Sequence, residues 1–353
     1  MNIRSTVLCL LCLTPAVRTL ATVSIIDDGG VGFSQTGSWS TQNTARVNGA
    51  WRYQSSPSGT DTATYEFSGL AGGRYVASRS TWAQGNTSNA TSYQISGAGG
   101  TYVQNQQVAA SSFDVANGAA TDVYTRLSGF NGYIPFSVTG GTVSVVVSDQ
   151  DAVNYLATDA IRLESVRNDV QKIHIVGNGD SGFSETGGTW AGFNAAGDHN
   201  GGFRYSGGAV GDMVQFKFDG IDPGNYRISG TWSAGGNRSS NVTLGYSTGP
   251  GSGSVSYSQK TGSAADDVFE GASWQDMFSN VTVTGTSLTL TLQNNASGGN
   301  ELLVADAFRL EKMDAVPEPG AFALAILGLA AAVSRRGRAG RASRTEAPRA
   351  AMV

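Results

Sequence analysis

The chain is poor in the side chains on which many enzymes and metal sites depend. Only two of its 353 residues are cysteine, two are histidine, and 14% are charged. Zinc sites and cysteine–histidine catalytic pairs draw on cysteine and histidine, so both are close to excluded. A serine–histidine–aspartate triad would need His174 or His199, and no G-x-S-x-G turn accompanies either. We predict surface or structural roles for both histidines and no enzyme, although counting alone leaves open a glycosidase-type carboxylate pair.

The cysteines have a simple explanation. Cys9 and Cys12 both lie in the apolar run at residues 7–13, which an arginine precedes and a small-residue stretch at 19–21 follows. This arrangement is typical of a secretory signal peptide, which we place at residues 1–21. The exported chain would then hold no cysteine, so its stability must come from core packing and not from disulfides.

The composition favours strands over helices. The chain has 48 glycines and is 40% hydrophobic, yet few segments show helical periodicity. Short alternating Val, Thr, Leu and Tyr runs lie between clusters of Gly, Ser and Asn. This pattern predicts an all-β protein, either a sandwich or a barrel, with one to three domains at this length.

An unusual strand occurs twice. Ala157–Glu164 reads A-T-D-A-I-R-L-E, and Val304–Glu311 reads V-A-D-A-F-R-L-E. Strict alternation places Asp159 and Asp306 on the apolar face of each predicted strand. A buried carboxylate must be paired or hydrogen-bonded, so the aspartate is expected to have a defined partner.

The repetition extends over most of the chain. D-x-x-x-G-F-S-x-T-G-x-W at Asp28–Trp39 has a one-residue-longer counterpart at Asn178–Trp190, and further motifs follow in the same order. We predict two copies of one module, at residues 24–165 and 173–312, each folding on its own and joined by a short charged linker. The runs at 143–147 and 287–292 are predicted as half-buried antiparallel strands, with the leucines of S-L-T-L-T-L facing inward.

The echoed aspartates have three interpretations. They can accept backbone N–H bonds from a nearby loop, or pair with Arg52 and Arg204. They can also be ligands of calcium, with further oxygens from the motifs that open the modules, although no EF-hand spacing is present. We favour a structural role for Asp159, Asp306, Arg52 and Arg204 and predict no cofactor, with calcium as the alternative. The further oxygens would come from Asp27, Asp28, Asn178 and Asp180.

Two tryptophans lie beside polar loops. Trp82 is followed by Q-G-N-T-S-N and Trp232 by S-A-G-G-N-R-S-S-N. Sugars present apolar C–H faces and many hydroxyls, so an aromatic ring beside amide and guanidinium donors suits them, although an aromatic repeated in both copies also suits a core. The predicted carbohydrate-binding residues are Trp82, Asn86, Asn89, Trp232, Asn237, Arg238 and Asn241.

The C-terminal region has its own pattern. Val316–Gly320 reads V-P-E-P-G, an apolar run follows at 321–333, and Arg335-Arg336 ends it. The run is short for a membrane span, which needs about 17–25 residues. The segment 316–336 resembles a PEP-CTERM sorting signal through Pro317, Glu318, Pro319, Arg335 and Arg336. The resemblance implies a Gram-negative bacterium, an apolar helix held transiently in the inner membrane, and cleavage by an exosortase-type enzyme; residues 337–353 would be a basic disordered tail.

The modules resemble the golvesin or xanthan-lyase type carbohydrate-binding-like domain. The resemblance rests on the two opening motifs, on Arg52-Tyr53 and Arg204-Tyr205, and on the closing A-D-A-F-R-L-E. It implies tandem jelly-roll-like antiparallel β-sandwiches and polysaccharide binding. In the loop after the tryptophan, Thr87 of the first copy stands where the second has Arg238, so the two copies need not share one ligand.

These observations lead to one functional hypothesis and two alternatives. We expect an exported, non-catalytic protein at the cell surface or outside the cell that binds polysaccharide or another matrix component through both modules. The alternatives are an adhesive or structural matrix protein without sugar binding, and a polysaccharide-cleaving enzyme. The net charge of −4 includes six arginines after Glu318, so the body is acidic and nucleic acid is a poor partner.

Overall fold

The computed structural model describes most of the chain between Ala21 and Asp314. The described residues are 21–43, 47–55, 60–80, 84–97, 100–108, 112–117, 120–127, 132–149, 154–194, 198–262, 265–297 and 301–314. Those up to Met313 belong to one compact unit. Residues 1–20 of the predicted signal peptide, the sorting segment 316–336 and the tail 337–353 lie outside these ranges.

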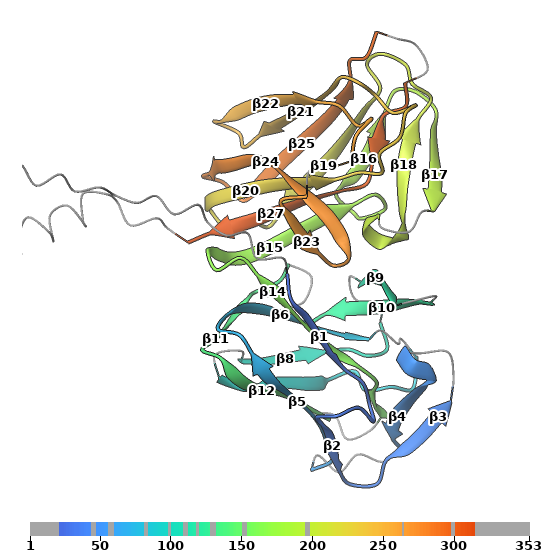
Figure 1. The fold of residues 1–353 in the computed structure, drawn as a ribbon, viewed down its shortest axis with the longest axis vertical. Coiled ribbons are helices and arrows are strands. Elements are labelled where there is room, and N and C mark those ends of the chain that lie inside the picture. The colour runs from blue at the N-terminus through green and yellow to red at the C-terminus, as the bar shows by residue number, and fades with distance from the viewer. Residues whose placement is uncertain are drawn as a thin grey trace, which may run out of the picture. The chain divides into compact units, whose positions relative to one another are not determined.

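All sheets of the described chain are antiparallel, and the first half forms three of them (Figure 1). Their orders are β1-β14-β6-β10-β9 with β11 beside β6, β2-β5-β12-β7-β8, and β13-β4-β3. The strands are β1 Val23–Ile26, β2 Phe33–Thr36, β3 Ser40–Asn43, β4 Ala50–Gln54, β5 Thr62–Leu70, β6 Gly73–Ser80, β7 Thr91–Ile95, β8 Gly100–Gln104, β9 Ser112–Asn117, β10 Ala120–Arg126, β11 Phe136–Val138, β12 Gly141–Asp149, β13 Leu156–Thr158 and β14 Ile161–Val166.

The second half repeats this arrangement. Its sheets have the orders β15-β27-β20-β24-β23, β16-β19-β25-β21-β22 and β17-β18-β26. The strands are β15 Val170–Gly177, β16 Phe183–Thr186, β17 Trp190–Asn194, β18 Gly202–Ser206, β19 Met213–Asp219, β20 Gly224–Thr231, β21 Val242–Ser247, β22 Ser252–Tyr257, β23 Asp267–Phe269, β24 Ala272–Val283, β25 Ser287–Asn294, β26 Val304–Ala305 and β27 Ala307–Met313. Two short 3-10 turns, η1 Val47–Gly49 and η3 His199–Gly201, occupy equivalent places.

Each half has its own core between its two larger sheets. In the second half, Leu288, Leu290 and Leu292 of β25 are at most 1% exposed, as the alternation predicts. Each such side chain contributes about 1.5–3 kcal/mol on burial. Their cluster also includes Phe308 and Leu310 of β27, from the facing sheet, so the all-β prediction and the sandwich packing are confirmed.

Equivalent glycines lie near the turns from β5 to β6 and from β19 to β20: Gly69 is the second-last residue of β5, and Gly220 directly follows β19. Gly69 and Gly220 have φ values of 72° and 69°. A residue with a Cβ adopts this conformation only at a cost, so glycine is favoured at both turns.

The strand with the echoed aspartate differs from its prediction. One continuous strand was expected from Ala157, but the chain leaves one sheet after β13, passes through Asp159, and enters another sheet as β14. Asp306 likewise separates β26 from β27. Each aspartate therefore lies at a corner between two sheets, which explains why it can be buried without occupying a place in either core.

A third apolar cluster draws residues from both halves. Phe113 and Tyr133 of the first half belong to it together with Phe269 and Trp274 of the second. Tyr133 and Ile173 also exchange backbone hydrogen bonds of 2.8 and 2.9 Å. The two-module division stays a prediction, because this cluster packs residues of both halves together.

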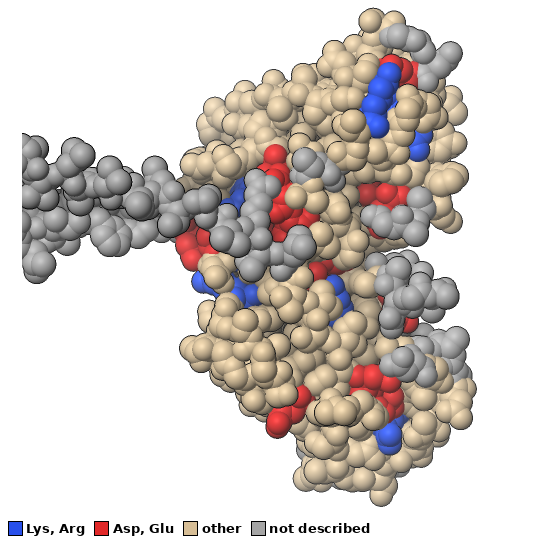
Figure 2. Space-filling view, viewed as in Figure 1, with Lys and Arg blue, Asp and Glu red and all other residues tan. Residues whose placement is uncertain are grey.

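Charged atoms are sparse on the viewed face and gather chiefly in a band across its middle (Figure 2). Ion pairs also connect the linker to the second half: Arg167 contacts Asp276 at 3.1 Å, and Arg227 contacts Asp169 at 2.5 Å. Strand β15 begins at Val170, three residues before the predicted start of the second module. In the described ranges, no helix is long and apolar enough to cross a membrane.

Candidate functional site

The two tryptophans predicted to bind sugar fare differently. Trp82 lies outside the described residues, whereas Trp232, directly after β20, is 7% exposed. Its ring lies 4.7 Å from that of Tyr257, and its indole nitrogen donates a hydrogen bond to Thr261 O at 3.1 Å. Trp232 is therefore a buried residue beneath the loop, and its ring is not exposed for stacking against a sugar. Sugar binding by its loop stays a prediction.

The loop after Trp232 has a fixed backbone. Ser239 N donates to Leu302 O, and Leu302 N donates to Asn237 O, each at 2.9 Å. Asn237 and Asn241 are exposed on this loop. The side chains of Asn237 and Asn241 thus face solvent from a loop whose backbone is hydrogen-bonded to Leu302, just before β26.

An aromatic patch lies beside this loop. We use the term for Phe193, Phe203, Tyr205, Trp232 and Tyr257. Phe193 on β17 is 55% exposed, and its ring lies 5.5 Å from that of buried Phe203 on β18. Phe203 in turn lies 6.2 Å from Tyr205 and shares an apolar cluster with Trp232. The exposed Phe193 ring thus packs against a layer of aromatic side chains that are buried or partly buried.

Arg238 brings a donor group to the same patch. Its guanidinium carbon is 5.1 Å from the centre of the Phe203 ring, on which it makes a cation–π contact. The guanidinium also donates to Ser233 O and to Asn237 Oδ1, at 3.3 and 3.0 Å. Arg238 is thus fixed against the buried Phe203 ring while staying partly exposed, and the exposed Phe193 packs on the same ring.

The first half carries a different surface at the equivalent place. Tyr53 of β4 stacks on Tyr155 at 5.7 Å, and both are half-buried. Asn86 and Asn89 are exposed on the neighbouring loop, and Tyr155 N donates to Asn86 O at 2.9 Å. Amide groups therefore lie near aromatic rings here as well, but the arrangement of the rings is not that of the second half.

The echoed aspartates have the partner that the structural interpretation predicts in one copy. Asp306 Oδ2 accepts the backbone N–H of His199 at 3.2 Å. The arginines pair elsewhere: Arg52 Nε lies 3.1 Å from Asp28 Oδ2, and Arg204 Nε lies 2.5 Å from Glu185 Oε1. The alternative pairing of these arginines with the echoed aspartates is therefore wrong, because each guanidinium has another carboxylate as its counter-charge.

The second-copy side chains suggested for calcium form hydrogen bonds to the backbone. Asn178 Nδ2 donates to Gly202 O at 2.8 Å, and Asp180 Oδ2 accepts Gly177 N at 2.7 Å. These groups close the turn after β15.

A buried ionic cluster joins the halves around Glu270. Arg126 donates to both of its carboxylate oxygens, at 2.9 and 2.8 Å, and His199 Nε2 lies 2.9 Å from Oε2. The Tyr133 hydroxyl donates to Oε1. Arg126, first among the favourable partners, holds the pKa of Glu270 well below its usual range despite burial. The side chains of Glu270 and His199 are at most 1% exposed, so a substrate has no access to this histidine–carboxylate pair.

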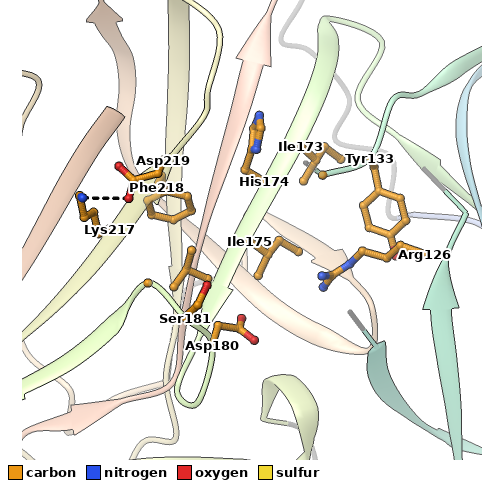
Figure 3. Close-up of a pocket in the computed structure, with 13 residues that line it drawn as sticks. Arg126, Tyr133, Ile173, His174, Ile175, Asp180, Ser181, Lys217, Phe218 and Asp219 are labelled. Carbon is orange, nitrogen blue, oxygen red and sulfur yellow. Dashed lines mark ion pairs between the residues drawn. The ribbon is translucent and has the colours of Figure 1, made fainter. Parts of the chain in front are cut away.

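A pocket of about 470 Å³ lies next to this cluster (Figure 3). Arg126 and Tyr133 form one end, and the ion pair of Lys217 with Asp219 at 2.8 Å forms the other. Between them lies His174, whose pKa burial lowers to about 4, so its ring is neutral at pH 7. The pocket contains no nucleophile paired with a base among its described lining residues. Both histidines of the chain are buried.

The stability of the chain is expected to depend on pH in opposite ways at two carboxylates. Burial, reinforced by Asp198, raises the pKa of Asp306 well above its ordinary 3.8. Its contribution is therefore present at low pH and lost as the pH rises through the folded-state pKa, whereas that of Glu270 is lost as the pH falls below 4.5. Asp306→Asn should reduce the loss of urea midpoint that accompanies a rise in pH above 3.8. An unchanged pH dependence in this variant would contradict the assignment.

Sequence reasoning missed Phe193, Arg126 and Glu270. Phe193 was overlooked because it lies beyond Trp190, where the echoed motif ends. Arg126 lies in a part of the first copy without a close echo, and Glu270 is 144 positions away from it. A signal for Glu270 was its place before Gly271, in a turn where Glu270 itself has a φ of 54°.

The comparisons with known proteins give distant likenesses. No family model and no curated protein matches the sequence. Among solved structures, Paenibacillus xanthan lyase is 18% identical with a TM-score of 0.35, over 80% of this chain and 25% of that one. The extracellular domain of ANXUR2 from Arabidopsis thaliana is 11% identical with a TM-score of 0.35, over 80% and 92% of the two chains. Isomalto-dextranase from Arthrobacter globiformis T6 is 9% identical with a TM-score of 0.29, over 74% and 36%. The chain spans about a quarter of the xanthan lyase that it matches.

Proposed function

We propose that this chain is an exported, non-catalytic protein that binds polysaccharide at the cell surface or in an extracellular matrix. The observation that carries the proposal is the aromatic patch: Phe193 is 55% exposed and stands on Phe203, beside Arg238 and Asn237. An exposed ring with neighbouring amide and guanidinium donors fits the apolar face and the hydroxyls of a sugar. Jelly-roll topology, golvesin-like ancestry and exosortase processing of the C-terminal segment belong to the same proposal.

Xanthan and dextran are suitable first probes, because one is anionic and the other neutral. Affinity electrophoresis of the full chain through gels containing each polysaccharide measures retention directly. Retention of the unmodified chain on either supports the proposal. Free migration through these and a wider panel of bacterial polysaccharides would favour the adhesive or structural alternative, while turnover of any of them would favour an enzyme.

Replacing Phe193 with alanine is expected to weaken polysaccharide retention about tenfold, because stacking on an aromatic ring contributes about 1 kcal/mol beyond buried area. The side chain is exposed, so the fold should tolerate its loss. Val210→Ala is the matched control, since Val210 is an exposed apolar residue of the same half at 65% exposure. Equal retention of the Phe193 variant and the unmodified chain would exclude the aromatic patch as the binding surface.

A further inference from the structure

Three carboxylates converge at one sheet corner in the first half. Asp27 and Asp28 follow β1, and Asp159 lies between β13 and β14. One oxygen from each lies within 4.8 Å of the others. Arg52 Nε lies 3.1 Å from Asp28 Oδ2. Three carboxylates thus lie close together at this corner.

A second observation is that one carboxylate oxygen of this group has no hydrogen-bond partner among the described residues. Asp159 is 8% exposed, and its Oδ1 has no hydrogen-bond partner among the described residues. A buried carboxylate oxygen without a partner is costly. The site therefore favours added positive charge, whether a proton or a metal ion.

The spacing suits a single metal ion. Calcium binds six to eight oxygens at about 2.3–2.6 Å, so two oxygens of one ion can be as much as about 5 Å apart. The 4.8 Å limit on this cluster falls within that span. Magnesium needs a tighter octahedron at about 2.0–2.1 Å and fits less well.

The second half provides an internal comparison. Ile26 pairs with Ile161, and Val176 pairs with Phe308, so Gly177 and Asn178 occupy the places of Asp27 and Asp28. There the Asn178 amide can donate to a backbone carbonyl, which a carboxylate cannot do. Asp306 accepts a backbone N–H at 3.2 Å. The copy without the two acidic residues thus holds its corner with hydrogen bonds.

We propose that Asp27, Asp28 and Asp159 bind a calcium ion that ties the end of β1 to the corner between β13 and β14. Neutralisation by the ion replaces the hydrogen bonds that the second half makes with Asn178. The ion is structural and belongs to the first half alone. It lies apart from the aromatic patch of the second half, so its test is independent of polysaccharide binding.

Terbium luminescence of the full chain tests the site, because Tb³⁺ is a calcium substitute that nearby aromatic rings sensitise. Tyr65, whose hydroxyl donates to Asp159 O at 2.8 Å, is the expected sensitiser. We expect saturable emission that Ca²⁺ displaces and that Mg²⁺ displaces poorly. Asp27→Asn should weaken Tb³⁺ binding at least about tenfold, since affinity follows the ligand charge. Asp306→Asn is the matched control and should leave the emission unchanged.

A thermal melt of the unmodified chain needs no variant. Calcium in the millimolar range should raise the melting temperature relative to EDTA, and this shift should vanish in Asp27→Asn. Absence of both Tb³⁺ emission and a calcium-dependent shift would overturn the proposal. So would equal loss of emission in the Asp306 variant, or displacement of Tb³⁺ by Mg²⁺ as readily as by Ca²⁺.

Discussion

Replacing Glu270 with glutamine is expected to lower the free energy of unfolding by about 3–5 kcal/mol, because the buried Arg126 guanidinium loses the carboxylate that pairs with it. Arg126 is 6% exposed and makes two charge-assisted bonds to this carboxylate. An amide can accept only one such bond and carries no charge. His199 and Tyr133, which also contact Glu270, would lose an acceptor of the same strength. Urea unfolding followed by circular dichroism measures the change.

The control for this variant is Glu66→Gln on the exposed face of β5, which should change stability by less than about 0.5 kcal/mol. A double variant, Arg126→Met with Glu270→Met, adds a sharper test. Removing both charges of a buried pair is often nearly neutral, so the double variant should lose less than the sum of the single variants. If Glu270→Gln is as stable as the control, the ionic cluster does not hold the two halves together.

Arg309→Ala is expected to cost a similar amount, about 3–5 kcal/mol, through both charge and packing. Arg309 is fully buried, and its Nη2 lies 3.0 Å from Asp267 Oδ2. Its guanidinium carbon lies 5.0 Å from the Trp274 ring and 5.5 Å from that of Phe269. Truncation leaves Asp267 buried without its nearest counter-charge and removes the stacked group from two aromatic faces.

Two further substitutions separate these effects. Arg309→Lys keeps the charge but loses the planar stack, so its cost should fall between those of the unmodified chain and the alanine variant. Arg204→Ala removes a half-exposed arginine whose partner Glu185 is also partly exposed, so it should cost only about 0.2–1 kcal/mol. Equal urea midpoints for Arg309→Ala and Arg204→Ala would show that the buried network contributes no more than a surface pair.

The sequence predicted those features that follow from local periodicity. The leucines of β25 face inward because a strand alternates its side chains, and the turn glycines Gly69 and Gly220 follow from the need for positive φ. The echoed aspartate was identified as unusual for the same reason. Its role at a corner between two sheets was not predicted. The chain leaves one sheet at Asp159 and enters another because of how the neighbouring strands pair, and a local sequence pattern does not show that pairing.

Contacts across the chain account for the rest. Arg162 and Glu164 were predicted on the face opposite the core, yet they are 2% and 1% exposed. Their face is covered by residues of the other half: Glu270 N donates to Glu164 Oε1 at 3.1 Å. Alternation tells which residues share a face but not whether a second body covers that face.

Hydrogen–deuterium exchange of the full chain with and without a retained polysaccharide tests most directly whether the aromatic patch binds sugar. We predict slower exchange of backbone amides in β17, in β18 and in the loop at residues 233–241 when the polysaccharide is present, with little change elsewhere. This protection should be lost in Phe193→Ala. Protection confined to the Tyr53–Tyr155 surface or to the pocket beside His174, with none at β17, would contradict the account.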